Sequence, residues 1–121
     1  MTIANDLNDV DEKMGLWIHM TAADTLEVSG TTPNTTDISL CEGWNLTGNP
    51  STQQLSVADA LNSIDGAYDL VYGYQAADTA DPWKKYDPTA PPFANDLNEM
   101  GPGWGYWIDA NQNATWTVSN P

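Results

Sequence analysis

Residues able to perform catalysis are scarce in this chain of 121 residues. His19 is the single histidine and Cys41 the single cysteine, although these two residue types supply most general bases, strong nucleophiles and zinc ligands in enzymes. The sequence contains no glycine-rich phosphate-binding loop. Pairs of carboxylates can hydrolyse glycosidic bonds, but a chain with 17 acidic residues contains such pairs by accident. We therefore expect that the protein is not an enzyme.

Aspartates in two predicted loops are the candidate metal ligands. Asp9 and Asp11 lie in the first loop, and Asp78 and Asp81 lie in the second. Carboxylate oxygens are the ligands that calcium prefers, although neither loop follows the 12-residue EF-hand pattern. The alternative is that these aspartates only form turns on an acidic surface. Calcium is the one cofactor that the sequence suggests.

Aromatic residues give the best binding hypothesis. The chain holds six Trp and five Tyr but one Phe. Exposed aromatic rings beside Asp and Asn suit sugars, because the ring face contacts apolar C–H groups while the polar side chains bind hydroxyls. The alternative is that a chain so poor in Phe uses these rings as its core. The candidate platform consists of Trp17, Trp83, Tyr86, Trp104 and Trp107.

The charge balance excludes two classes of partner. The chain has three Lys, no Arg and a formal net charge of −14. Binding to nucleic acid or to an anionic membrane requires clustered basic residues. No apolar run of about 18 residues is present, so we expect no membrane insertion. Three Asn-x-Thr sequons are typical of an exported protein; they begin at Asn34, Asn45 and Asn113.

An internal repeat dominates the sequence. Residues 3–30 and 93–120 align without a gap and are identical at 11 of 28 positions. Apolar residues alternate in both copies, which predicts two equivalent hairpins at about 14–29 and 104–119 with their even-numbered side chains inside. Two interpretations remain open. Either the copies pack within one domain, or residues 1–30 are the tail of one repeat and residues 31–120 form a complete second one.

The region between the copies predicts further strands and one helix. Strands are expected at 38–41, 43–47, 68–76 and 83–86. Ser56 and Asp59 resemble a capping box, so the helix should span about 56–65 and end at Asp65-Gly66. Residues 1–121 are therefore expected to form a single β-rich module. Its fold class is α+β, mostly antiparallel β with one short helix.

Three segments carry a family resemblance: Met14-Gly-Leu-Trp-Ile-His, Gly43-Trp-Asn-Leu-Thr-Gly-Asn-Pro-Ser51 and Gly103-Trp-Gly-Tyr-Trp-Ile108. Together they resemble a module repeated in archaeal, and some bacterial, secreted and cell-surface proteins. That module has G-[FY]-W-[IV] strands around a GWN-[LM]-V-G-Y-P-S turn, followed by a short helix. The resemblance covers about residues 13–119. Here Thr47 and Asn49 replace the usual Val and Tyr, and Leu16 stands where an aromatic residue is common.

The resemblance implies a multidomain surface protein and supplies no catalytic residues. We expect a non-catalytic extracellular accessory module, acting as a spacer or adhesion unit with a possible polysaccharide or glycan ligand and with neighbouring domains. One alternative is a carbohydrate-binding module of a polysaccharide-degrading enzyme. Another is a structural repeat of a surface layer or filament.

Overall fold

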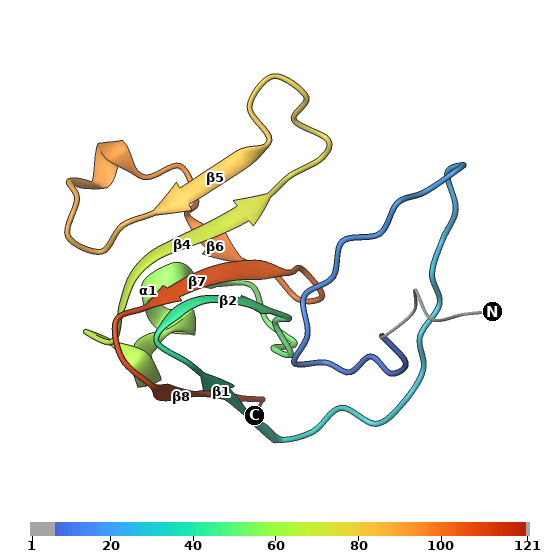
Figure 1. Ribbon diagram of the computed structural model, residues 1–121, viewed down its shortest axis with the longest axis horizontal. Coiled ribbons are helices and arrows are strands. Elements are labelled where there is room, and N and C mark those ends of the chain that lie inside the picture. The colour runs from blue at the N-terminus through green and yellow to red at the C-terminus, as the bar shows by residue number, and fades with distance from the viewer. Residues whose placement is uncertain (1–6, 121) are drawn as a thin grey trace.

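The computed structural model describes residues 7–120, which are mostly antiparallel β structure with one short helix (Figure 1). This arrangement confirms the predicted fold class. The strands are β1 (Thr35–Leu40), β2 (Gly43–Thr47), β3 (Leu55–Ser56), β4 (Tyr68–Tyr74), β5 (Trp83–Tyr86), β6 (Glu99–Met100), β7 (Tyr106–Ala110) and β8 (Ala114–Ser119). The helical segments are α1 (Val57–Ala60) and the 3-10 turns η1 (Asn62–Ile64) and η2 (Pro92–Ala94). No helix in this range is long and apolar enough to cross a membrane.

The main sheet has the strand order β2-β7-β4-β5, and all its pairs are antiparallel. β7 is an inner strand that pairs with β2 on one side and with β4 on the other. Its residues alternate strictly: Tyr106, Ile108 and Ala110 are buried, whereas Trp107 and Asp109 are partly exposed. One face of the sheet therefore covers the core, and the other face meets solvent.

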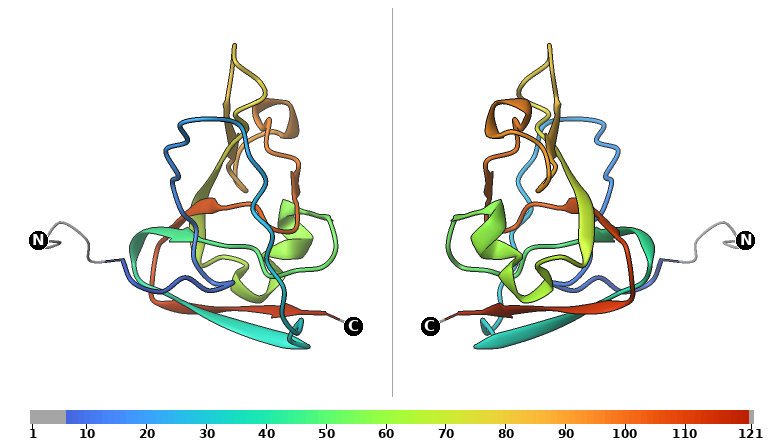
Figure 2. Two further views of the ribbon diagram at one scale, coloured as in Figure 1. Left: turned by 90° about the vertical axis from the view of Figure 1, so that its right-hand side faces the viewer. Right: turned by 90° about the vertical axis from the view of Figure 1, so that its left-hand side faces the viewer.

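The strands β1 and β8 form a ribbon that continues β2 and β7 around a corner. In the side views this ribbon lies along the lower edge of the molecule, below the helical turns (Figure 2). Two asparagines hold the corner. The Asn45 side chain accepts a hydrogen bond from the Cys41 amide (3.0 Å) and donates to the Cys41 carbonyl (2.8 Å), and the Asn113 side chain accepts from the Glu42 amide (2.9 Å). Gly43 bends the chain there with φ 103°, a conformation that favours glycine.

The helix begins at the predicted cap. The Ser56 hydroxyl accepts a hydrogen bond from the Asp59 amide (3.2 Å), so α1 starts at Val57. The α-helical turn is short and passes into η1, which ends before Gly66 with its φ of 83°. The predicted span of about 56–65 is thus helical, but only its first part is α-helix. The apolar stripe of Val57, Leu61 and Ile64 is buried.

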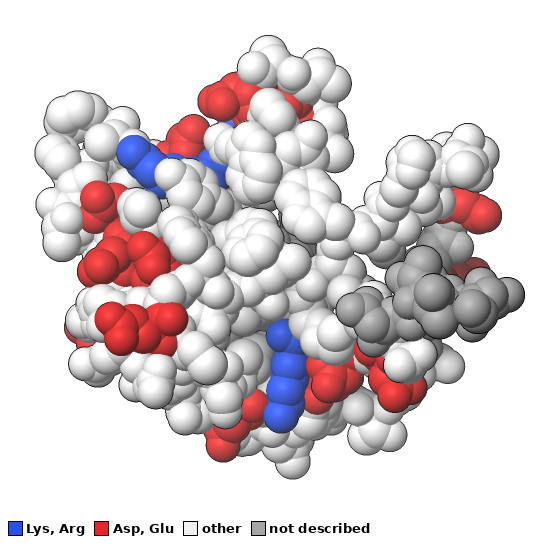
Figure 3. Space-filling view, viewed as in Figure 1, with Lys and Arg blue, Asp and Glu red and all other residues white. Residues whose placement is uncertain are grey.

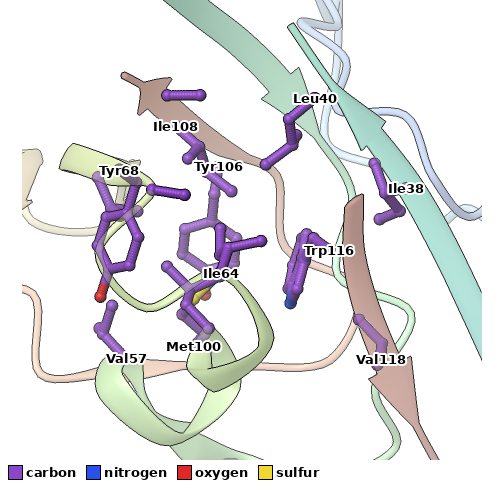
Figure 4. Close-up of a cluster of buried hydrophobic side chains, with 14 of the residues drawn as sticks. Ile38, Leu40, Val57, Ile64, Tyr68, Met100, Tyr106, Ile108, Trp116 and Val118 are labelled. Atoms are coloured by element: carbon purple, nitrogen blue, oxygen red, sulfur yellow. The ribbon is translucent and has the colours of Figure 1, made fainter. Parts of the chain in front are cut away.

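The core lies between the main sheet, the helical turns and the β1–β8 ribbon (Figure 4). Trp116 on β8 is its largest fully buried side chain. The indole N–H of Trp116 donates to the Ala60 carbonyl at the end of α1 (2.8 Å). Burial of an indole with its polar edge satisfied fixes the ribbon against the helix.

The predicted hairpin at 104–119 is wrong in its pairing. Strands do form at 106–110 and 114–119, with Tyr106, Ile108, Trp116 and Val118 buried as the alternation predicts. These two strands do not pair with each other, because the corner sends β7 into the main sheet and β8 to β1. Trp104, which the alternation placed inside, precedes β7 and is 49% exposed.

The predicted hairpin at 14–29 does not form. Residues 15–34 contain no strand, and Met14 makes a single bridge to Thr47. Leu16, which was expected inside, is 41% exposed, and Val28 is 83% exposed. The second copy occupies the edges of β1, β2 and β4 that an equivalent hairpin would use, and this segment meets β2 only at the Met14–Thr47 bridge. The structure therefore does not show two equivalent hairpins.

β4 also differs from its predicted alternation. The sequence places Tyr68, Leu70, Tyr72 and Tyr74 on one face. A register shift between Tyr68 and Leu70 changes the phase of the strand. Tyr68 and Val71 are consequently both buried, while Tyr72 and Tyr74 lie on the outer face.

We predict that Trp116→Phe lowers the free energy of unfolding by about 3 kcal/mol, because it leaves the Ala60 carbonyl without its donor and creates a cavity. Urea unfolding followed by circular dichroism measures this loss. Trp44→Phe is the matched control: Trp44 is 50% exposed, so the change should be less than about 0.5 kcal/mol. Equal losses in the two variants would contradict the assigned role of Trp116.

Candidate aromatic binding face

The outer face of the main sheet is aromatic. Trp107 on β7 lies opposite Leu46 on one side and Tyr72 on the other, and Tyr74 lies opposite Trp83. Residues opposite each other in a sheet share a face. The register therefore gathers aromatic rings from four strands on one surface. Figure 3 shows an uncharged central area that is bordered by red acidic atoms and by some blue lysine atoms. We call this surface the aromatic face: Trp44, Tyr72, Tyr74, Trp83 and Trp107.

A hollow of about 550 Å³ lies on the aromatic face, lined by Trp44, Tyr72, Trp83 and Trp107. The rings of Trp44 and Tyr72 are nearly parallel, with centroids 5.6 Å apart and planes at 30°. Trp83 stands edge-on to Tyr72, at 6.2 Å and 85°. The hollow thus offers flat ring surfaces in more than one orientation, and its volume lies within the usual range for ligand sites.

Trp17 reaches the same face from the N-terminal segment. Its ring makes edge contacts with Tyr74 (5.0 Å) and Trp83 (5.8 Å). Trp17 nevertheless remains 60% exposed, because no strand holds its backbone. A second hollow of about 280 Å³ lies beside the first and includes Trp17, Trp104 and Trp107 in its lining.

The predicted platform is brought together only in part. Trp83 and Trp107 line the larger hollow, Trp17 contacts Trp83, and Trp104 lies at the adjoining hollow. The placement of Tyr86 in the platform is wrong. Tyr86 pairs with Val71, so it lies on the inner face and packs against the core.

Sequence reasoning missed two members of the larger hollow. Trp44 was placed in a predicted strand and a turn motif but not in the platform, and Tyr72 was placed on the same face of its strand as Tyr68. The signal for Trp44 was present in the strand 43–47, where Trp44 and Leu46 alternate with Asn45 and Thr47. Thr47 is buried and Trp44 is exposed, as that alternation requires.

Few charged side chains point from the same face of the sheet. Asp109 lies opposite Trp44 and Leu70, and Lys85 lies opposite Tyr72. Together with the Tyr72 and Tyr74 hydroxyls, these groups supply hydrogen-bond donors and acceptors around the rings. The face therefore combines apolar planes with a few polar groups, as sites for uncharged polar ligands do.

The groups whose pKa values are shifted lie outside the aromatic face. Burial raises the pKa of Tyr106, whose hydroxyl accepts a hydrogen bond from the Gly101 amide (2.8 Å), and burial also raises the pKa of Tyr68. Hydrogen bonds from Thr89 lower the pKa of Asp87 within a turn. These groups belong to the core and the loops, so none of them contributes a perturbed acid or base to the aromatic face.

The candidate calcium ligands lie in two separate places. The Asp11 side chain accepts from the Lys13 amide (3.0 Å), and the Asp78 side chain accepts from the Asp81 amide (3.2 Å). The Lys84 ammonium lies 2.8 Å from Asp78 and 3.7 Å from Asp81. Across residues 7–120, no group of three or more metal-ligating side chains occurs. Calcium binding at Asp9/Asp11 or Asp78/Asp81 stays a prediction of the sequence.

Comparison with known proteins gives no further guide. No protein-family model matches this chain, and neither a curated protein nor a solved structure is detectably similar to it. The aromatic face and its geometry therefore have to carry any functional argument.

We predict that Lys84→Met raises the pKa of Asp78, because the hydrogen bond from Lys84 holds it below its ordinary value. An Asp whose pKa is lowered on folding stabilises the protein above its unfolded pKa of about 3.9. That contribution is lost as the pH falls through the folded pKa, so Lys84→Met should weaken the acid-dependent loss of stability. NMR titration of the carboxyl groups measures the shift. Lys85→Met is the control; an equal effect on Asp78 would contradict the assignment.

Proposed function

We propose that this chain is a non-catalytic accessory module of an extracellular or cell-surface protein, and that its aromatic face binds a neutral glycan. The observation that supports the proposal most directly is the hollow of Trp44, Tyr72, Trp83 and Trp107 on a rigid sheet. Sugar rings present apolar C–H faces that pack on such planes, with hydroxyls at their edges for polar groups. A sheet holds the rings in place, so little side-chain entropy is lost on binding.

The negative charge of the chain favours a neutral ligand over a polyanionic one. With a net charge of −14, the surface repels polyanions such as uronic-acid polymers, nucleic acids and anionic lipid headgroups. Figure 3 shows acidic side chains, together with some lysine side chains, around the uncharged central area. A neutral polysaccharide would avoid this repulsion and would still meet the rings.

Two observations support an exported location. Asn34 and Asn113, which begin sequons, are exposed. Asn113 bonds the corner through its side-chain oxygen, and glycosylation occurs on the side-chain nitrogen. Asn45, which begins the third sequon, is instead occupied in the corner by bonds to Cys41, Gly43 and Ile108. The resemblance to modules of archaeal and bacterial surface proteins points in the same direction and implies neighbouring domains.

The two alternatives differ in what adjoins the module. A carbohydrate-binding module of a polysaccharide-degrading enzyme would use the same aromatic face, so neighbouring domains and not this chain distinguish it. A structural repeat of a surface layer or filament would need contacts between units. The exposed apolar side chains of residues 16–28 favour that second alternative as an additional role.

We predict that the protein binds insoluble cellulose or chitin and that Trp44→Ala and Trp83→Ala each reduce the affinity about tenfold, since loss of one stacked ring removes about 1.4 kcal/mol. Depletion of the protein from solution by increasing amounts of each polysaccharide measures the dissociation constant. Alginate, a polyanion, should not compete.

Trp104→Ala is the matched control, because Trp104 is exposed to the same degree as Trp44 but does not line the larger hollow. It should change the affinity less than about threefold. The absence of binding to every neutral polysaccharide tested would contradict the proposal. Equal losses in all three variants would contradict the assignment of the larger hollow as the site.

A further inference from the structure

The two sequence copies have opposite environments at matching positions. Every buried apolar residue between positions 93 and 120 has an apolar counterpart 90 residues earlier, and every counterpart is exposed. The exposed fractions are 41–83% in the first copy against 0–6% in the second. The pairs are Leu7/Leu97, Val10/Met100, Leu16/Tyr106, Ile18/Ile108, Met20/Ala110, Leu26/Trp116 and Val28/Val118.

In the second copy, elements from the middle of the chain cover these side chains. β7 lies between β2 and β4, β8 pairs with β1, and β6 pairs with β3. Leu61 and Ile64 of the helical segment join the same core cluster. All these covering elements belong to residues 35–74, and each is already engaged by residues 99–119. The first copy has the same apolar pattern without those partners.

Two polar residues that the copies share make structural hydrogen bonds in the second copy. The Asn95 side chain accepts from the Asp87 amide (2.9 Å) and donates to its carbonyl (3.1 Å). The Asp96 side chain accepts from the Lys85 amide. These bonds fix the chain entering β6 to the end of β5. The sequence repeats the same two residues at positions 5 and 6, which lie outside the described residues.

We propose that residues 3–30 complete a preceding unit of the same polypeptide, in which they form the equivalents of β6, β7 and β8. The partner is a segment resembling residues 31–92, which supplies β1 to β5 and the helix. The order of segments in the chain indicates where this partner lies. In the complete unit, residues 31–92 come directly before residues 93–120. By the same order, the partner of residues 3–30 comes directly before residue 3. The proposal concerns assembly and does not depend on glycan binding.

The exposure of these alternating apolar residues explains why residues 15–34 form no strand in a single unit. A two-stranded hairpin is marginally stable in water, and an apolar alternating pattern needs a sheet and a core before it forms a strand. In repeat proteins each unit gains stability from its neighbours. Residues 16–20 and 24–29 have the same alternation of apolar residues as β7 and β8. They lack only a sheet edge to pair with and a core to pack against.

The test is a chain in which a second copy of residues 31–92 is placed directly before residue 3. The backbone amides of residues 16–20 and 24–29 should exchange with solvent at least about a hundredfold more slowly than in the unextended protein. Hydrogen exchange followed by NMR or mass spectrometry measures each segment. Unchanged exchange in both segments would overturn the proposal.

A double variant, Ile18→Asp with Val28→Asp, supplies the control. In the extended chain it should abolish the slow exchange. In the unextended chain it should shift the melting temperature by less than about 2 °C, since both side chains are exposed there. Retained protection in the extended double variant would also contradict the proposal.

A second experiment guards against an extension that fails to fold for another reason. In the full chain, residues 104–119 are replaced by the sequence of residues 14–29. The proposal expects this chain to unfold cooperatively with a lower melting temperature, because Leu26 fills less space than Trp116. Loss of cooperative unfolding would show that the first copy cannot act as β7 and β8. A strand-exchanged dimer of the unmodified chain, detected by light scattering, would likewise contradict the tandem arrangement.

Discussion

Hydrogen bonding on both sides of β7 is the constraint on which the rest of the structure depends. Because β7 pairs with β2 and with β4, its alternation is imposed on the whole sheet. Tyr106 and Ile108 then point into the core cluster that includes Trp116, and Trp107 is partly exposed on the other face. The same strand thus separates the core from the aromatic face. The corner held by Asn45 continues this order into the β1–β8 ribbon, which closes the core from below.

Local patterns predicted the parts of the fold that depend on local interactions. The cap at Ser56, the strands around 43–47 and 83–86, and the inward faces of β7 and β8 agree with the sequence, because capping and alternation are properties of short segments. Strand partners are different. A three-residue connection between two alternating segments suits a hairpin and a corner equally well, and the pairing is decided by which other edges are free. The hairpin at 14–29 was mispredicted for this reason: its segments alternate, but the strand edges that β7 and β8 use are taken by the second copy.

The sequence predicted that aromatic residues form the candidate site, but it did not predict which of them lie together. Composition indicated aromatic binding, and the register of four strands then selected which rings share a surface. Tyr86 could have been separated from Trp83 by sequence, since an odd spacing along a strand places two side chains on opposite faces. Tyr72 could not have been placed, because the register shift near Tyr68 reverses the phase of β4 and leaves no local signature. The acidity of the chain, in contrast, follows from composition alone and disfavours polyanionic ligands.

Trp17 connects the N-terminal segment with the aromatic face. Its ring rests against Tyr74 and Trp83 while its backbone is held by no strand. A ligand that needs those ring surfaces has to displace Trp17, and a neighbouring unit that draws residues 16–20 into its own sheet removes it as well. Thermodynamic linkage makes the two events reciprocal: the factor by which a neighbour raises ligand affinity is the factor by which the ligand favours the neighbour. An array built in this way would hold its ligand more tightly at each completed joint than at a free end.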